Sequence, residues 1–178
     1  LIWTYDGKEE ESNACGENAT WELTADGRLI ITGTGEMYDY SADDLQYAPW
    51  YENRSSIKKI VISDGITAVG AFAFCNCSNA VTVELPDSVQ VIRKGAFENC
   101  ALETMTLPKT LTSIEERAFG GCKAEYVVIP DSVQTIGKRA FHDSSIVKVE
   151  LPSGLEVIED GLFEDCHYLV TVILPTKK

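Results

Sequence analysis

The sequence predicts a solenoid that is mostly β, in which short coils of chain stack in a row behind an N-terminal cap. Two residue types recur along the chain with one period. Prolines that follow Leu or Ile recur at spacings of 22, 22, 22 and 23 residues, at Pro86, Pro108, Pro130, Pro152 and Pro175. Phenylalanines recur at spacings of 23, 22, 22 and 22 residues, at Phe74, Phe97, Phe119, Phe141 and Phe163. A fixed period of this length is typical of stacked coils that share one core.

Residues 1–56 lack the repeat and are expected to form the cap. All three tryptophans and five of the seven tyrosines lie there. Residues 21–24 (Trp-Glu-Leu-Thr) and 28–31 (Arg-Leu-Ile-Ile) flank the short loop at residues 25–27, which predicts a β-hairpin. An open solenoid end exposes core and strand edge, so we expect the hairpin and an aromatic plug to cover it. A small carbohydrate-type site on the same aromatic side chains is the alternative.

Residues 57–178 are expected to form about five coils of 22–23 residues. Each coil has two apolar residues separated by one other residue, which is the pattern of a short strand with one buried face. These pairs are Ile60/Ile62, Val83/Leu85, Met105/Leu107, Val127/Ile129, Val149/Leu151 and Val172/Leu174. The proline that follows five of these pairs cannot donate to a ladder, so it ends the strand. Turns or short helical pieces are expected on the return side of each coil, where one copy has Leu111, Ile114, Ala118 and Phe119.

The last predicted strand, which contains Leu174, leaves three possibilities open for its outer edge. An unpaired strand edge is a place where other chains can pair. Lys177 and Lys178 guard this edge, or the edge pairs with another chain in self-association, or more protein follows Lys178.

The best copy of the repeat carries the full pattern Cys100-x-Leu102-x-x-Met105-x-Leu107-Pro108-x-x-Leu111-x-x-Ile114-x-x-x-Ala118-Phe119-x-x-Cys122. From about Ile57 to Pro175, the sequence resembles the BspA-like (Treponema-type) leucine-rich repeats of bacterial surface proteins. Residues 15–23, followed by Asp26-Gly27 and residues 48–51, are similar to the N-terminal segment common before such arrays. The resemblance implies a leucine-rich repeat solenoid, in a secreted or cell-surface bacterial protein that binds other proteins.

Charge and hydropathy exclude some classes of partner. The chain has 28 acidic and 15 basic residues, a net charge of −13, which argues against binding to nucleic acid or anionic lipid. No apolar run approaches the roughly 20 residues that a spanning helix needs, so direct membrane insertion is not expected. The chain opens at Leu1 without a charged-then-apolar leader. We expect an extracellular or cell-surface location, with a signal sequence that was removed or never belonged to this chain.

One column of the repeat holds four of the six cysteines and one serine: Cys77, Cys100, Cys122, Ser144 and Cys166. Such a column points inward, and free Cys is among the most buried residue types, so we expect structural thiols. Neighbouring coils are close enough for a disulfide, but stacked side chains run parallel, which leaves a disulfide or a metal site as the weaker alternatives. Cys15 and Cys75 lie outside this column, and they are the one pair for which a bridge is considered.

Catalytic chemistry has little support in this sequence. The chain has no nucleophile elbow, His-Glu-x-x-His motif or phosphate-cradling glycine loop, so no catalytic residue, enzyme activity or cofactor is expected. Acidic pairs are interpreted as solvated turns, because they lack the ligand spacing of a calcium loop, and no metal ligand is assigned. Weak calcium binding in the cap is the alternative. The acidic groups are Glu9-Glu10-Glu11, Asp43-Asp44, Glu115-Glu116 and Glu159-Asp160.

The outward positions of the predicted strands are the candidate binding residues, because they form columns on a sheet face of about six strands. They include Val61, Thr82, Glu84, Thr104, Thr106, Tyr126, Val128, Lys148, Glu150 and Ile173. Val61, Tyr126, Val128 and Ile173 are apolar or aromatic where solvated columns would be polar, which favours a protein-binding patch. The equal alternative is that β-branched residues merely favour strands.

The function expected from these observations is that of a non-catalytic protein-binding module. Its partner would be a protein ligand, such as a host extracellular or mucosal protein, held on the strand face for adhesion or recognition. A structural spacer or assembly unit within a larger surface protein is the alternative. The two functions differ in whether the strand-face columns matter for binding.

Overall fold

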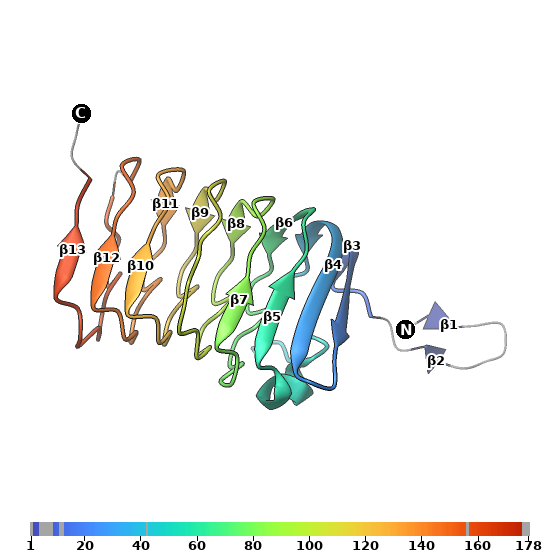
Figure 1. The fold of residues 1–178 in the computed structure, drawn as a ribbon. Coiled ribbons are helices and arrows are strands. Elements are labelled where there is room, and N and C mark those ends of the chain that lie inside the picture. The colour runs from blue at the N-terminus through green and yellow to red at the C-terminus, as the bar shows by residue number, and fades with distance from the viewer. Residues whose placement is uncertain (1, 4–8, 11–12, 42, 156, 176–178) are drawn as a thin grey trace.

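The computed structural model shows a row of stacked coils that begins at a β-hairpin (Figure 1). It describes residues 2–3, 9–10, 13–41, 43–155 and 157–175. Within these residues the chain forms one 3₁₀ helix, η1 (Tyr51–Ser56). The strands are β1 (Ile2–Trp3), β2 (Glu9–Glu10), β3 (Gly16–Leu23), β4 (Arg28–Met37), β5 (Lys59–Ile62), β6 (Ile66–Val69), β7 (Thr82–Glu84), β8 (Val91–Ile92), β9 (Ser113–Ile114), β10 (Tyr126–Val128), β11 (Thr135–Ile136), β12 (Lys148–Glu150) and β13 (Thr171–Ile173).

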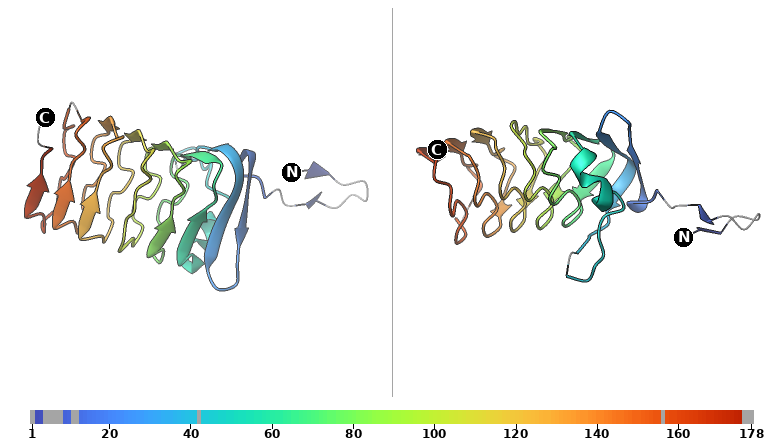
Figure 2. Two further views of the ribbon diagram at one scale, coloured as in Figure 1. Left: turned by 45° about the horizontal axis from the view of Figure 1, so that its top comes forward. Right: turned by 90° about the horizontal axis from the view of Figure 1, so that it is seen from below.

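Two sets of parallel strands run along the array, one on the strand side and one on the return side of the coils (Figure 2). On the strand side, β5 pairs with β4 and β7, and β12 pairs with β10 and β13. On the return side, β6, β8, β9 and β11 pair in chain order. Partners lie one repeat apart, so that Val149 stands between Val127 and Val172. The predicted β solenoid behind an N-terminal hairpin is confirmed.

The return side consists of short strands and turns, where the sequence left room for short helical pieces. The residues in these strands include Val91, Ile92, Ile114 and Ile136, whose branched Cβ atoms favour extended backbone. Helical pieces on the return side are therefore not found among the described residues. The buried member of each pair, such as Ile92 or Ile114, still packs into the core as the repeat predicts.

The strand side is interrupted at the third coil, where the sequence predicts a strand at Met105-x-Leu107. Both residues are buried, as the pattern requires, but residues 101–107 form no strand. A hydrogen bond from Glu103 N–H to Val81 O ties this segment to the coil before it, ahead of the expected strand. Met105 is unbranched at Cβ, whereas the other coils have Val or Ile there, so the segment has less β preference. The prediction of one sheet face of about six strands is wrong, because the ladder is in two parts.

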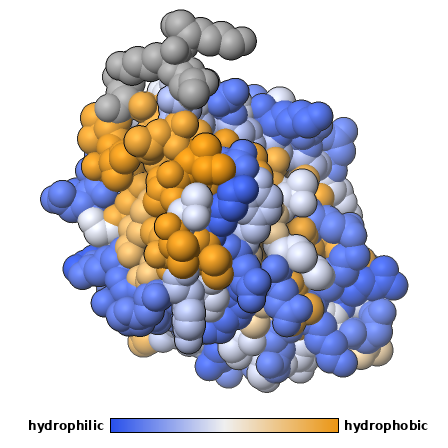
Figure 3. Space-filling view, turned by 60° about the vertical axis from the view of Figure 1, so that its left-hand side comes forward, coloured by the Kyte–Doolittle hydropathy of each residue, from blue (hydrophilic) through white to orange (hydrophobic). Residues whose placement is uncertain are grey.

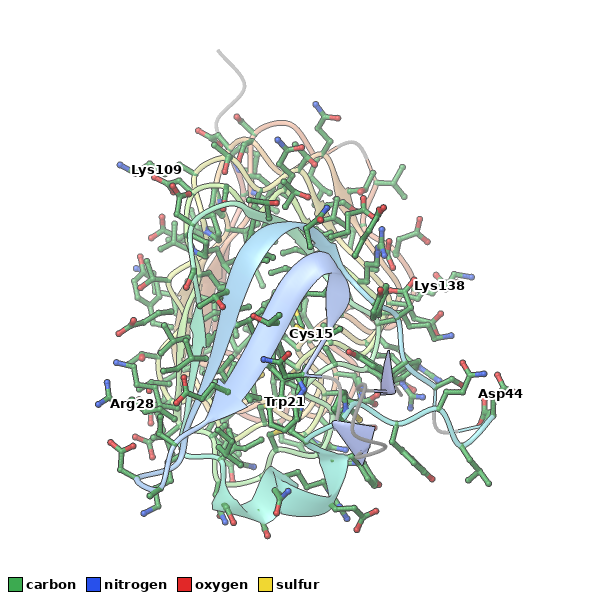
Figure 4. The ribbon with its side chains drawn as sticks, turned by 90° about the vertical axis from the view of Figure 1, so that its right-hand side faces the viewer. Cys15, Trp21, Arg28, Asp44, Lys109 and Lys138 are labelled. Atoms are coloured by element: carbon green, nitrogen blue, oxygen red, sulfur yellow. The ribbon has the colours of Figure 1, made fainter. Side chains whose placement is uncertain are left out.

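The hairpin of β3 and β4 closes the N-terminal end of the array, as seen in Figure 4 beside Cys15 and Trp21. The long strand β4 belongs to both sides of the solenoid. Its residues 28–31 pair with β5, and its residues near Glu36 pair with β6. Gly33 permits the bend between these two parts, since its φ is +119° and an added Cβ would lie 2.0 Å from Asn18 O. The two-residue strands β1 and β2 form a separate antiparallel pair.

A stack of aromatic rings runs through the core from the cap to the last coil. Its phenylalanines are those of the repeat, with neighbouring ring centroids 5.2, 5.4, 5.6 and 6.1 Å apart. Trp50 extends the stack into the cap, 5.5 Å from Phe74 and nearly parallel to it. Trp21 and Tyr40 contact Trp50 edge-on. These rings form the aromatic plug that the tryptophan-rich cap predicts. The boundary between cap and array at residue 56 remains a prediction.

Candidate binding surface

The outward columns of the strand side differ in how far they reach into solvent. Tyr126 and Val128 on β10 are 48% and 44% exposed, and Ile173 on β13 is 39% exposed. Glu84 on β7 is also exposed, whereas Val61 on β5 and Thr82 on β7 are half-buried. The apolar character of this surface is therefore concentrated in the part built from β10, β12 and β13.

The predicted residues Thr104 and Thr106 do not join this sheet. Both are exposed, but they lie in the segment between β7 and β10 that forms no strand. The candidate site residues are thus separated into a group on β5 and β7 and a group on β10, β12 and β13. We call the second group, with Tyr126, Val128, Lys148, Glu150 and Ile173, the strand-face patch.

Three side chains of the strand-face patch hold one another in place. The Tyr126 hydroxyl donates a hydrogen bond to Glu150 Oε1 across the two strands. Lys148 Nζ lies 4.9 Å from the centre of the Tyr126 ring and 3.7 Å from Glu150 Oε1, so the ammonium contacts both ring and carboxylate. The hydrogen bond to Glu150 raises the pKa of Tyr126 above its ordinary value, because the bond requires the phenol proton. The phenol therefore stays neutral and fixed in orientation at physiological pH.

The charges of the strand face are paired with one another. Lys59 on β5 forms an ion pair with Glu84 on β7, and Lys148 pairs with Glu150 on its own strand. The outward columns carry two lysines and two glutamates, so their formal charge is zero within a chain of net charge −13. This surface is neutral and partly apolar, whereas the rest of the molecule is acidic.

The six cysteines are free in this structure, so the bridge considered between Cys15 and Cys75 is not formed. Cys100 Sγ donates to Phe74 O at 3.1 Å, one coil back, and the column residues Cys77 and Cys122 are buried. Burial raises the pKa of Cys75 to about 11 and that of Cys15 to about 12. Only the thiolate attacks electrophiles or binds metals, so the raised pKa makes the thiols of Cys75 and Cys15 poor nucleophiles and poor metal ligands at neutral pH.

Within the described part of the chain, the acidic pairs show no arrangement that would hold a cation. Among the described residues no three His, Cys, Asp or Glu side chains come together as metal ligands, and Asp43 and Asp44 are exposed on their loop. Glu11, like Lys177 and Lys178, lies outside the described residues. His142 reaches over Gly120 to place Nε2 3.2 Å from Glu98 Oε1, so it takes part in a contact between coils.

Two features that join the cap to the repeat array were missed in the sequence. Trp50 lies 24 residues before Phe74, close to the repeat period, and this spacing could have placed it in the aromatic stack. Its indole N–H donates to Ala73 O at 2.8 Å. In the next coil the equivalent acceptor, Ala96 O, receives the backbone N–H of Phe74 instead. Arg93 joins the second coil to the cap through ion pairs with Glu36 and Asp39. No sequence signal links Arg93 to carboxylates more than 50 residues away.

Stacked coils with parallel strands, a buried Phe column and a strand-ending proline define a solenoid of the leucine-rich repeat class. The profile of the BspA type leucine-rich repeat region matches residues 48–170 in six copies, which is more than half of the chain. The chain therefore belongs to the BspA-type leucine-rich repeat family, as the repeat pattern predicts. The first matched copy takes in Trp50, in agreement with the place of its ring in the stack.

Solved structures with the same architecture come from several bacteria. A leucine-rich repeat protein from Eubacterium ventriosum is 28% identical, with a TM-score of 0.85 over 91% of this chain and 43% of its own. The T. pallidum leucine-rich repeat protein is 25% identical, with a TM-score of 0.70 over 91% of this chain and 82% of its own. The chain thus spans less than half of the E. ventriosum protein. No curated protein sequence matches the chain.

No helix among the described residues is long and apolar enough to cross a membrane.

Proposed function

We propose that this chain is a non-catalytic protein-binding module of a secreted or cell-surface bacterial protein, and that its strand-face patch holds the partner. The observation that carries this proposal is the exposure of Tyr126 and Val128 on β10 and of Ile173 on β13, on either side of β12, whose two charges are already paired with each other. Exposed aromatic and aliphatic side chains on a rigid sheet are the usual anchors of a protein interface. Repeat proteins of this class offer such an extended surface without moving parts.

The chemistry of the strand-face patch favours a neutral, partly apolar partner surface. Lys148 and Glu150 form an ion pair with each other, so their charges contribute more to the orientation of a partner than to its affinity. The acidic remainder of the molecule disfavours acidic partners through long-range repulsion. A host extracellular or mucosal protein that offers an apolar patch fits this surface, and the role would then be adhesion or host recognition.

The proposal is tested by capture from extracellular-matrix and mucus extracts with the intact chain and with Tyr126→Asp combined with Val128→Asp. Both substituted side chains are exposed, so the variant is expected to fold, with an unchanged circular dichroism spectrum. The double variant places two carboxylates in the patch and is expected to lose the partner that the intact chain holds.

A matched control combines Tyr38→Asp with Leu45→Asp. These side chains are 49% and 75% exposed, lie off the strand face, and give the same loss of one aromatic and one aliphatic residue. The control is expected to retain the partner. Equal capture by all three chains would overturn the strand-face proposal, and no partner for any of them would favour the spacer or assembly unit.

A further inference from the structure

Two inward side chains on the strand side are less covered than their equivalents in other coils. Val83 on β7 and Leu85 just after it are half-buried, whereas Val127 and Ile129 in the fourth coil are 0% and 3% exposed. Inward residues also lose cover on the last described coil, at the end of the molecule where apolar side chains gather in Figure 3, because no described coil stacks on them. A third coil does follow Val83 and Leu85. Its strand side therefore packs less closely against β7 than other coils pack against their neighbours.

The backbone of the third coil is also unpaired on the strand side. In the fifth coil, Lys148 N–H donates to Glu125 O, one coil back, at 3.0 Å. Thr104 stands at the equivalent position of the third coil, and in the described part of the chain no N–H or C=O of residues 104–107 forms a backbone hydrogen bond. We call this segment, residues 104–107, the seam. It lies between the edges of two ladders, β7 on one side and β10 on the other.

The rest of the third coil is bonded to both of its neighbours. On the return side, β9 pairs with β8 and with β11. In the core, the Phe119 ring lies 5.4 Å from that of Phe97 and 5.6 Å from that of Phe141. On the strand side, the described bonds of this coil occur only before the seam, at Glu103 N–H and Leu102 O. The continuous contacts and the unpaired segment are thus on opposite sides of one coil.

This arrangement makes the seam the place where the strand side opens most easily. Elsewhere on that side, the separation of two coils breaks the hydrogen bonds of a ladder. At the seam no such bonds are lost, and only the packing of Met105 and Leu107 opposes the movement. Segments with few backbone hydrogen bonds have the lowest free energy of local opening.

We infer that the seam is a hinge of the solenoid. The cap with the first two coils rotates relative to the fourth and later coils, about the return-side ladder of β8, β9 and β11, which stays bonded. The rotation widens or narrows the strand side between β7 and β10, and it changes the curvature of the array at the third coil. The candidate binding residues on β5 and β7 therefore move relative to the strand-face patch. This inference does not depend on what that patch binds.

The test compares two distances that both begin on β4 and end in the fourth coil. Spin labels at Arg28→Cys and Tyr126→Cys report on the strand side, and labels at Glu36→Cys and Thr135→Cys report on the return side. All four side chains are exposed. Each pair is separated by four strand spacings, or about 19 Å.

Both pairs are introduced into the full chain with Cys75→Ser and Cys166→Ser, because these two thiols are only half-buried and would also take up label. Double electron–electron resonance is expected to give a distance distribution at least about twice as wide for the strand-side pair as for the return-side pair. Equal widths for the two pairs would overturn the inference.

Matched variants at Met105 link the motion to the unpaired backbone. Met105→Ile favours extended backbone and is expected to narrow the strand-side distribution to the width of the return-side pair, whereas Met105→Leu should leave it broad. The inference would also fail if Met105→Ile slowed amide exchange at Thr104 and Thr106 but left the strand-side distribution broad. The ladder would then be closed without any effect on the motion.

Discussion

At the scale of single residues, the Trp50 side chain both stacks on Phe74 and donates a hydrogen bond to the next coil. In later coils the phenylalanine ring provides the stacking and its backbone N–H provides the hydrogen bond. The Trp50 ring begins the aromatic stack, and its indole N–H satisfies Ala73 O, which would otherwise be a buried acceptor without a donor. A phenylalanine, the residue used by every later coil, could do only the first. The tryptophan therefore joins a non-repeating cap to a repeating array.

Replacement of Trp50 separates these two contributions. We expect Trp50→Phe to keep the stack but to leave Ala73 O unpaired, at a cost of about 1–3 kcal/mol in the free energy of unfolding. Trp50→Ala also removes the packed ring and is expected to cost about 3–5 kcal/mol. Urea unfolding followed by circular dichroism measures both values. A Trp50→Phe variant as stable as the original chain would show that the indole hydrogen bond contributes nothing.

The thiol of Cys75 gives a prediction of pH dependence. Its pKa is raised from 9.0 to about 11 by burial, so the thiolate at pH 8 is about a hundredfold rarer than for the unperturbed thiol. Alkylation by iodoacetamide is expected to be slow at pH 8 and to rise about tenfold for each pH unit up to about pH 11. Mass spectrometry of the labelled peptide measures the rate, with Cys75→Ser as the blank. Rapid labelling that levels off below pH 9 would contradict the raised pKa.

At the scale of elements, the third coil shows that burial and strand formation are separable. Met105 and Leu107 point into the core like their counterparts, yet residues 101–107 add no strand between β7 and β10. The strand side therefore consists of two smaller ladders joined through a shared core. The strand-face patch belongs wholly to the second ladder.

A branched residue at Met105 is expected to join the two ladders. Met105→Ile nearly conserves volume and gives the third coil the Cβ branching of its neighbours, worth up to about 1 kcal/mol in a strand. Amide exchange at Thr104 and Thr106 should slow, and the thermal midpoint should rise slightly. Met105→Leu is the control, since it is also apolar but unbranched at Cβ. Equal exchange in both variants would show that branching is not what interrupts the sheet.

At the scale of the whole molecule, charge is distributed unevenly. The chain has a net charge of −13, while the outward strand columns, with Lys59, Glu84, Lys148 and Glu150, sum to zero. A partner bound there through apolar contacts should be nearly indifferent to salt. A partner bound elsewhere through the acidic surface would be released as ions screen the charges.

Salt therefore distinguishes the two modes of capture. In 1 M NaCl the screening length falls to about 3 Å, and capture by the strand-face patch is expected to change by less than about twofold. The measurement is the amount of partner retained by the intact chain between 0.05 M and 1 M NaCl. A loss of tenfold or more over this range would indicate binding through exposed charges and would argue against the patch.

The repeat columns could be predicted because one period places each residue in the same environment in every coil. Leu111, Ile114 and Phe119 are buried for this reason, and the hairpin followed from its turn residues. The contacts among Tyr126, Lys148 and Glu150 could not be predicted, because they depend on side-chain rotamers, and the bond from Tyr126 to Glu150 runs diagonally between two strands. The interruption at Met105 was missed because the alternation of apolar and polar residues indicates which side chains are buried. It does not indicate whether the segment forms backbone hydrogen bonds with its neighbours as a strand.

Each coil forms its backbone hydrogen bonds with the coil before it and the coil after it, as from Gly137 N–H to Ile114 O and from Phe119 N–H to Ala140 O. A ribosome releases the cap and Trp50 first, so each new coil can pair with a coil that has already been synthesised. The growing protein then exposes one coil of core at a time. At synthesis rates of about 5–20 residues per second, a new coil arrives roughly every 1–4 s. We therefore expect folding to keep pace with translation.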